Sequence, residues 1–175
     1  MMSQTIVKME GISKAFAGIK ALDNVQIDLR QGEIHALMGE NGAGKSTLMK
    51  IMTGVYSRDS GKMYLQNASS NQLEEVEIKS PLAAQKLGLS MVFQEFNLLE
   101  NMNIAENIFI GREPLGAGQT VDKKQLIQNA AVELKKVNLD IDPSTEVSKL
   151  SCGQKQCVEI AKALSRDARI LIMDE

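Results

Sequence analysis

One run of eight residues constrains the fold of this chain more than any other feature. Residues 39–46 read Gly-Glu-Asn-Gly-Ala-Gly-Lys-Ser and fit the pattern G-x-x-x-x-G-K-[ST] at every fixed position. Its three glycines let the backbone adopt conformations that a Cβ penalises, so that successive N–H groups can point inward at an anion. The run therefore predicts a loop that cradles the phosphates of a nucleoside triphosphate.

The residues around the loop supply the setting that it needs. Residues 33–38 form a short, largely apolar run that predicts a buried strand, and residues 47–52 predict a helix. In a strand–loop–helix unit, Lys45 places its charge on the β and γ phosphates and the Ser46 hydroxyl coordinates Mg²⁺. The N-terminal dipole of the helix adds to this attraction. A glycine-rich turn without a ligand is the alternative, and this setting disfavours it.

Length and charge bound the class of protein. A chain of 175 residues favours one domain with a genuine core. The net charge of −2 gives no overall basic field, so we expect no nucleic-acid partner. No apolar stretch approaches the roughly 20 residues that span a bilayer, and the polar start has no signal-peptide pattern, so we expect a soluble cytoplasmic chain. We expect Cys152 and Cys157 to be free thiols.

Hydrophobic patterning predicts a small β layer followed by a crossover unit. Apolar and polar residues alternate in several segments, the pattern of half-exposed strands. A crossover helix between two strands implies that they run parallel. The predicted elements are strands at 5–10, 25–30, 61–66 and 89–93, a helix that starts at Ser80-Pro81 and stops at Gly88, and a polar loop or insertion at 67–79.

The remainder of the chain changes to helical patterning from about Asn97. Residues 122–138 place apolar side chains on one face, with Asp122 as the N-cap. A last helix starts at Gly153, and residues 170–173 predict a buried parallel strand.

Two acidic residues, Asp174 and Glu175, follow that last strand. Behind a phosphate loop, the Asp is expected to hold Mg²⁺ directly or through water, and the Glu to polarise the water that attacks the γ-phosphate. The alternative is that they are merely the polar end of a strand.

The run Leu150-Ser151-Cys152-Gly153-Gln154 brings in a family resemblance. Leu-Ser-x-Gly-Gln between a phosphate loop and an Asp-Glu strand resembles the signature of ABC-type ATPases, from about residue 4 to the last residue. The resemblance implies an α/β fold: a P-loop NTPase core of the ABC type with a small antiparallel β layer and a helical subdomain. Residues 1–175 would then be a partial nucleotide-binding domain, with residues 1–94 and 150–175 as core and β layer and 95–149 as the helical subdomain.

The same resemblance implies roles for single residues. Phe16 would stack on adenine, with ordinary core packing as the alternative. Gln94 would sense Mg²⁺ and the γ-phosphate, with a simple polar strand end as the alternative. Cys152 stands where the family more usually has glycine. The implied sets are Glu175 and Gln94 for catalysis; Ser46, Gln94 and Asp174 for the metal; and Phe16, Gly39, Glu40, Asn41, Gly42, Ala43, Gly44, Lys45, Ser46 and Thr47 for ATP, with Ser151, Gly153 and Gln154 on the ATP of a partner domain.

Four longer runs narrow the resemblance. Residues 34–48, 93–98, 106–113 and 158–165 look like bacterial importers of ribose, galactose, arabinose and xylose, in which two such domains lie in tandem. This chain resembles the first. The resemblance implies ATP and Mg²⁺ as cofactors, and as partners the membrane permease subunits, a second ABC domain in tandem or as a dimer, and indirectly a periplasmic sugar-binding protein. It implies a peripheral location on the cytoplasmic face of the inner membrane.

The family domain continues for roughly 60 residues or more beyond Glu175, a size in keeping with ordinary α/β domains. We therefore expect an incomplete domain with weak nucleotide binding and negligible hydrolysis. Two alternatives to an importer stay open: a non-transport ABC ATPase that acts in DNA repair or on ribosomes, and a non-hydrolysing nucleotide-binding fragment.

Overall fold

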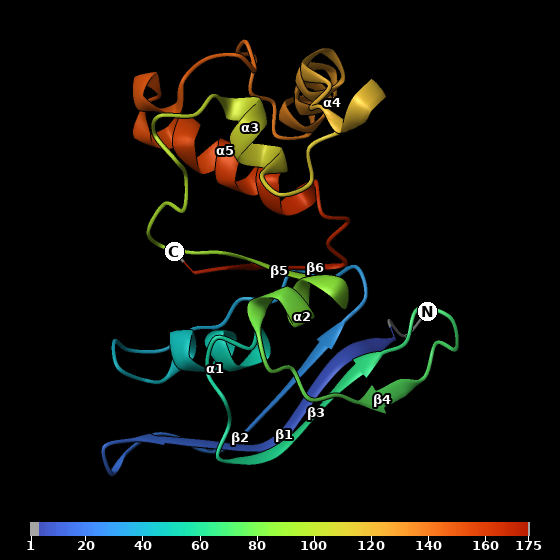
Figure 1. Cartoon of the computed structure of the whole chain (residues 1–175). Helices are drawn as coiled ribbons and strands as arrows, with labels where there is room; N and C mark the ends of the chain where they lie inside the picture. Colours follow the sequence, from blue (N-terminus) through green and yellow to red (C-terminus); the bar gives the residue numbers. More distant parts are fainter. Residues whose placement is uncertain (1–3, 175) are drawn as a thin grey trace. The chain divides into compact units, whose positions relative to one another are not determined.

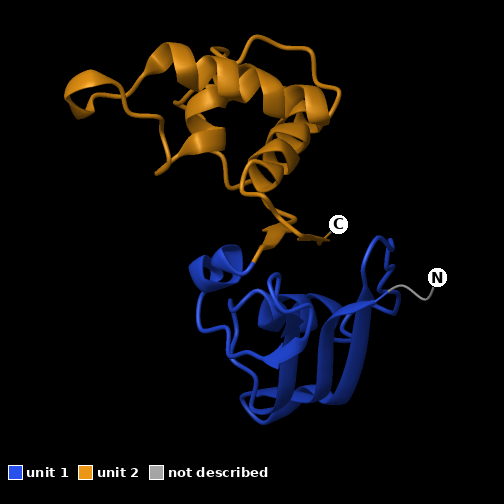
Figure 2. Ribbon diagram, turned by 90° about the vertical axis from the view of Figure 1, so that its right-hand side faces the viewer, with its two compact units in different colours: residues 1–87 blue, residues 88–175 orange. Residues whose placement is uncertain are grey.

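The computed structural model describes residues 4–174 and forms two compact units, the first ending at Leu87 and the second beginning at Gly88 (Figure 2). Most strands lie in the first unit and most helices in the second (Figure 1). In chain order, the elements of the first unit are β1 (Thr5–Phe16), β2 (Ile19–Arg30), α1 (Lys45–Met52), β3 (Ser60–Gln66), β4 (Leu73–Glu75) and α2 (Pro81–Lys86). Those of the second are β5 (Leu89–Val92), α3 (Ile104–Phe109), η1 (Ala117–Gln119), α4 (Lys123–Lys136), η2 (Val147–Lys149), α5 (Cys152–Leu164) and β6 (Ile170–Met173).

A four-stranded antiparallel sheet in the order β2-β1-β3-β4 forms the first unit. β1 and β2 are joined by Ala17 and Gly18, whose φ angles are +47° and +83°. Two successive left-handed residues match the right-handed twist of a hairpin, so Phe16 pairs directly with Ile19. The predicted small β layer is confirmed, and its strands extend further toward the hairpin than the predicted segments.

The core of this unit follows from the alternation along its strands. Val7 and Met9 of β1 turn inward at alternate positions, and Ile12 does so after a register shift. Helix α1 adds one apolar face at positions i, i+3 and i+4. Burial of that face fixes where α1 starts relative to the sheet. The buried apolar residues include Val7, Met9 and Ile12 on β1, Leu22 on β2, Met63 and Leu65 on β3, and Leu48, Ile51 and Met52 on α1.

Two predictions for this unit were wrong. Residues 33–38 form no strand, and Ile34 and Met38 are exposed. An apolar run becomes a strand only where a second strand takes its N–H and C=O groups, and no ladder to residues 33–38 exists among residues 4–174. The polar segment 67–79 is not all loop, because Leu73–Glu75 pairs with β3 as β4.

In the second unit, β5 and β6 run parallel, which confirms the parallel strand predicted for residues 170–173. The crossover prediction for the strands at 61–66 and 89–93 was wrong, because β3 and β5 lie in different sheets: β3 pairs antiparallel with β1 and β4. Leu89 pairs with Ile170 and Val92 with Met173. The Asp174 N–H donates to the carbonyl of Val92 at 3.1 Å and continues the ladder past the last paired residue. The carboxyl ends of both strands therefore lie at the same edge.

Three helices pack around one core in this unit. Asp122 accepts a hydrogen bond from the N–H of Gln125 at 3.0 Å, which confirms the predicted N-cap of α4. Helices α3, α4 and α5 contact one another pairwise and share a buried cluster, so α5 belongs to the same core as the two helices that precede it. The cluster consists of Ile104, Ala105 and Ile108, Leu126, Ala130 and Leu134, Val147 and Leu150, and Val158 and Ala161.

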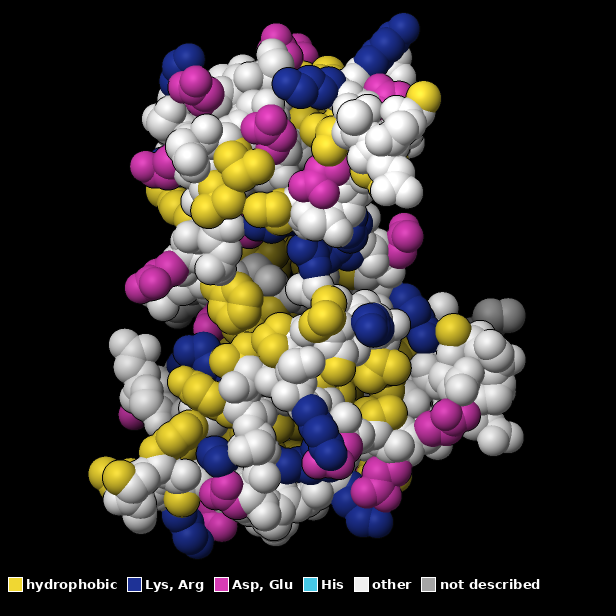
Figure 3. Space-filling view, viewed as in Figure 1, with side chains coloured by type: hydrophobic (Ala, Val, Ile, Leu, Met, Phe, Trp, Pro, Cys, Tyr) yellow, Lys and Arg dark blue, Asp and Glu magenta, His cyan; other side chains and the backbone are white. Residues whose placement is uncertain are grey.

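Within the described residues, no helix is long and apolar enough to cross a membrane. On the face seen in Figure 3, basic and acidic side chains are interspersed over each unit. Cys152 and Cys157 are both free, as expected.

Asn107 of α3 is a buried polar residue that holds the segment before its own helix. Its side chain is 1% exposed, and its Oδ1 accepts the N–H of Leu99 at 2.7 Å. Its Nδ2 donates to the carbonyls of Leu99 and Asn103, each at 3.0 Å. One amide thus satisfies backbone groups that would otherwise be buried without partners.

Asn107→Ala is expected to lower the free energy of unfolding by about 1 to 3 kcal/mol, since it orphans these buried backbone groups. Urea unfolding followed by circular dichroism measures the change. Asn101→Ala, at an exposed position in the same segment, is the control and should be close to neutral. Equal effects of the two substitutions would contradict the role given to Asn107.

Candidate functional site

The phosphate-loop residues 39–46 form an open turn that leads directly into α1. The Ala43 N–H donates to the carbonyl of Glu40 at 3.1 Å, and Gly44 is the N-cap residue of α1. Gly42 and Gly44 have φ angles of +85° and +87°, the left-handed region that L side chains disfavour. These glycines allow the chain to turn tightly before the helix, so that Lys45 and Ser46 occupy its first two positions.

Gly44 carries a second constraint because it lies against β2. A Cβ at this position would lie 2.5 Å from the carbonyl oxygen of Ala21 and 2.6 Å from Leu22 Cδ2. A Cβ at Gly42 would meet nothing within 4 Å. Strand β2 therefore supports the loop at Gly44, whereas Gly42 lies on its open side.

The ammonium of Lys45 folds back over the loop. Its Nζ donates to the carbonyl of Gly39 at 2.7 Å and to that of Glu40 at 3.0 Å. A lysine ammonium carries three donors on a flexible stem, so it can exchange these carbonyls for phosphate oxygens. Ser46 and Thr47 are half-buried in the first turn of α1, while Glu40, Asn41 and Ala43 are exposed.

Phe16 lies at the end of the β1–β2 hairpin in the same unit and is 40% exposed, which does not fit ordinary core packing. Its ring meets the edge of the Tyr56 ring, with centroids 5.2 Å apart and planes inclined at 68°. Lys14 Nζ lies 5.5 Å from the Phe16 centroid and is paired with Asp59 at 2.7 Å. That hydrogen bond from Lys14, with another from the Ala15 N–H, lowers the pKa of Asp59. Phe16 is thus an exposed ring held in a defined setting.

Tyr56 was missed by the sequence reasoning. It follows the end of α1, and Lys50 Nζ lies 5.7 Å from its ring centroid. The only sequence signal was an aromatic residue just beyond the helix that carries the loop lysine. Its contact with Phe16 joins residues 40 positions apart, which no local pattern reports.

The second unit contains two further predicted residues at one sheet edge. Gln94 follows β5 and is exposed, and Asp174 follows β6 and is half-buried. Because Val92 and Met173 are paired neighbours, the residues that follow them leave the sheet at the same end. Gln94 and Asp174 therefore follow two neighbouring strands at the same end of the sheet, while Glu175 lies outside the described residues.

The signature residues form the start of α5. Ser151 is its N-cap: its Oγ accepts the Gln154 N–H at 3.4 Å, and Gln154 Oε1 accepts the Ser151 N–H at 2.8 Å. This reciprocal capping box begins the helix one residue before the predicted start. Ser151, Cys152 and Gly153 are exposed, and a Cβ at Gly153 would meet nothing within 4 Å. Contacts among residues 4–174 therefore do not require glycine at position 153.

By donor type, the proposed metal residues fit Mg²⁺. Ser46 offers a hydroxyl oxygen, Asp174 a carboxylate and Gln94 an amide oxygen, the hard oxygen ligands that this ion prefers. From residue 4 to residue 174, no three His, Cys, Asp or Glu side chains gather as a metal site.

Comparison with known proteins identifies the family. A family model described as ABC transporter matches residues 22–175. The chain belongs to the ABC transporter family. It is 51% identical over 174 residues to a putative ribose/galactose/methyl galactoside import ATP-binding protein of Burkholderia cenocepacia, covering 99% of this chain and 33% of that protein. It is 48% identical over 172 residues to a ribose import ATP-binding protein of Clostridium perfringens, covering 97% of this chain and 33% of that protein.

The ABC fold also matches solved structures. The ADP conformation of an ATP-binding cassette of an ABC transporter superposes with a TM-score of 0.82 at 29% identity, covering 99% of this chain and 69% of that one. The predicted fold class is thereby confirmed. The chain spans about a third of the length of the curated relatives it matches.

Substitution at the two left-handed glycines should separate backbone strain from steric support. Gly42→Ala is expected to cost about 1 to 2 kcal/mol of stability, the penalty of a left-handed conformation alone. Gly44→Ala should cost clearly more, because its Cβ also meets the carbonyl of Ala21. Thermal unfolding of the two variants compares them, and equal costs would contradict the support of the loop by β2.

Proposed function

We propose that this ABC chain is the nucleotide-binding part of a machine that couples ATP binding and hydrolysis to the import of a monosaccharide. One observation carries the proposal: loop 39–46 leads into α1 with Gly44 packed against β2 and with Lys45 and Ser46 at the first positions of the helix, the arrangement that phosphate binding requires. The relatives at 51% and 48% identity are named as sugar import ATP-binding proteins, and this supports the transport role.

In this proposal the loop binds the triphosphate of ATP. Backbone N–H groups of Gly42 to Thr47 point to phosphate oxygens, and the Lys45 ammonium leaves the carbonyls of Gly39 and Glu40 for the β and γ phosphates. Phe16 stacks on the adenine with its ring plane set by Tyr56.

Ser46, Asp174 and Gln94 supply oxygen ligands to Mg²⁺, which when bound neutralises charge on the phosphates. Gln94 and Asp174 leave the same edge of the β5–β6 sheet, which supports a shared role for them. Glu175, which the structure does not describe, is proposed as the base for the attacking water.

The signature faces a second nucleotide. Ser151, Gly153 and Gln154 lie at an exposed helix N-terminus, which suits contact with the γ-phosphate of ATP held by a second ABC domain, in tandem or as a dimer. The Ser151 hydroxyl accepts its capping bond and can still donate its proton to an anion.

Permease subunits are the proposed membrane partners, with a periplasmic sugar-binding protein acting indirectly through them. The chain would lie peripherally on the cytoplasmic face of the membrane. A role in DNA repair or on ribosomes is not favoured, because relatives at 48% and 51% identity are named for sugar import.

Lys45→Ala is expected to lower ATP turnover on the order of 100-fold, since it removes a positioned charge from the transferred phosphate. Steady-state phosphate release by the protein as expressed from its own gene, together with its membrane subunits, measures the effect. Lys86→Ala, at an exposed lysine of α2, is the control and should keep the parent rate. Turnover within about two-fold of the parent in Lys45→Ala would sink the proposal.

Phe16→Leu should weaken binding of ATP by about ten-fold, because base stacking on an aromatic ring contributes on the order of 1 to 3 kcal/mol. Binding of tripolyphosphate, which has no base, should stay unchanged. Ile19→Ala, directly across the hairpin, serves as the control. Calorimetric titration of both ligands distinguishes them, and an equal loss for ATP and tripolyphosphate would rule out base stacking.

A further inference from the structure

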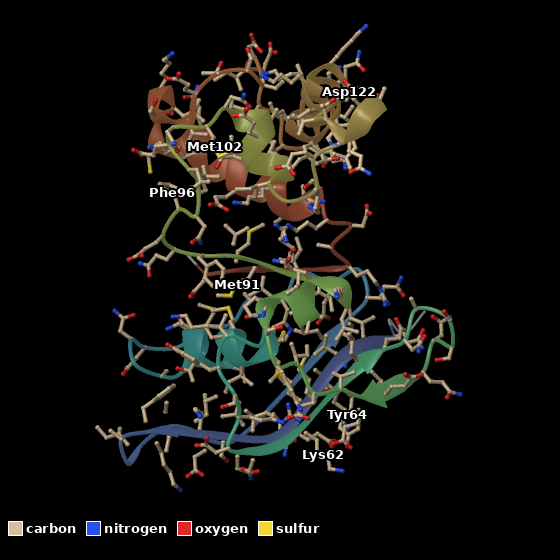
Figure 4. The ribbon with its side chains drawn as sticks, viewed as in Figure 1. Lys62, Tyr64, Met91, Phe96, Met102 and Asp122 are labelled. Atoms are coloured by element: carbon tan, nitrogen blue, oxygen red, sulfur yellow. The ribbon has the colours of Figure 1, made fainter. Side chains whose placement is uncertain are left out.

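Helix α5 contains a buried carboxylate that the proposed nucleotide chemistry does not use. Glu159 is 7% exposed, and its Oε1 accepts the backbone N–H of Asn97. Asn97 lies in the segment that leads from β5 to α3, where Figure 4 labels Met91, Phe96 and Met102 in succession. Burial of a carboxylate is costly unless its oxygen is hydrogen-bonded, so this bond holds the segment and the helix together.

Lys162, three residues after Glu159 on α5, binds the backbone carbonyl of Asn97. Its Nζ donates to the carbonyl of Asn97 at 2.8 Å. Burial lowers the pKa of Lys162, which marks this ammonium as partly withdrawn from water. Side chains from one helix therefore hold both the N–H and the C=O of Asn97, and the segment cannot slide along α5 without breaking both bonds.

Side chains of α5 and α3 also bind residues that follow Asn97 in the same segment. Lys155, near the start of α5, pairs with Glu100 at 2.6 Å, and this contact lowers the pKa of Glu100. Asn107 of α3 holds the N–H and carbonyl of Leu99. Residues 97, 99 and 100 are thus attached to two helices of the same core, in contrast to the exposed Gln94 three residues before Asn97.

This attachment connects two parts of the proposed site. Helix α5 begins at the signature residue Ser151, and the held segment begins just after Gln94. We propose that Glu159 and Lys162 are positioning residues that make the segment after Gln94 move as one body with the signature helix. The inference rests on the proposed function and deepens it: a displacement of α5 then changes where Gln94 lies, so the membrane subunits can influence turnover through this segment.

The test compares ATP turnover with and without the membrane subunits in lipid vesicles and takes the ratio of the two rates. Glu159→Leu removes the acceptor and is expected to lower that ratio at least about five-fold, within the usual range of coupling between sites. Glu159→Gln keeps an acceptor oxygen at the same place and should retain most of the ratio. Lys123→Met, at an exposed lysine of α4, is the control and should match the parent.

A merely structural role predicts a different result. Loss of folded protein lowers both rates in proportion and leaves the ratio unchanged, and that outcome would overturn the inference while the proposed function stands. If the parent protein hydrolyses no ATP, the proposed function fails and the inference fails with it.

A second measurement covers the case in which Glu159→Leu does not fold. Lys162→Met removes only the donor to the Asn97 carbonyl, and hydrogen exchange at the backbone amides of residues 96–100 should accelerate by about ten-fold, as expected for loss of a charged hydrogen bond. Unchanged exchange together with an unchanged rate ratio would overturn the inference.

Discussion

The contact between Gly44 and strand β2 is the constraint on which the candidate site depends. Because glycine has no Cβ, the loop can approach the carbonyl of Ala21 at a distance that a side chain would not permit. This approach sets where α1 begins, and the buried face of Leu48, Ile51 and Met52 holds the helix there. The positions of Lys45 and Ser46 therefore follow from the packing of α1 and the loop against the β layer. The proposed phosphate contacts depend on this packing, because it holds both residues at the start of the helix.

In the second unit, side-chain hydrogen bonds to the backbone hold a segment in place, as the Gly44 contact does for the loop in the first unit. Its helical core is apolar, yet its connection to the segment after β5 depends on Asn107, Glu159 and Lys162, each bonded to backbone groups. Such bonds are directional, whereas apolar contacts tolerate sliding. The segment after Gln94 is thus placed more definitely than its exposure alone suggests.

Local patterns predicted the elements whose stability is local. The alternation at the start of β1, the N-cap Asp122 and the helix start at Ser80-Pro81 were all readable because their signals lie within a few residues. The run 33–38 failed because an apolar pattern states that a strand is possible but not that a partner strand exists. Strand β4 was not predicted because its short sequence has no strand pattern, and it is a strand only because it pairs with β3.

The residues of the candidate site also fall into those that local sequence patterns predict and those that only tertiary contacts reveal. The loop and signature were found from spacing, whereas Tyr56 and Glu159 were not. Tyr56 matters through a contact with Phe16 far away in the sequence. Glu159 looks like a charged residue on a solvent face of an amphipathic helix, and only the fold shows that it is buried against Asn97. Contacts of this kind depend on tertiary packing, which spacing does not encode.

The central claim is that the backbone of loop 39–46 cradles phosphate, and backbone amide chemical shifts test it most directly. Titration of the isotope-labelled chain with ATP and Mg²⁺ should move the amide resonances of Gly42, Gly44, Lys45 and Ser46 furthest, because their N–H groups acquire phosphate acceptors. Unmoved loop amides at saturating nucleotide, with shifts confined to other parts of the chain, would contradict the account.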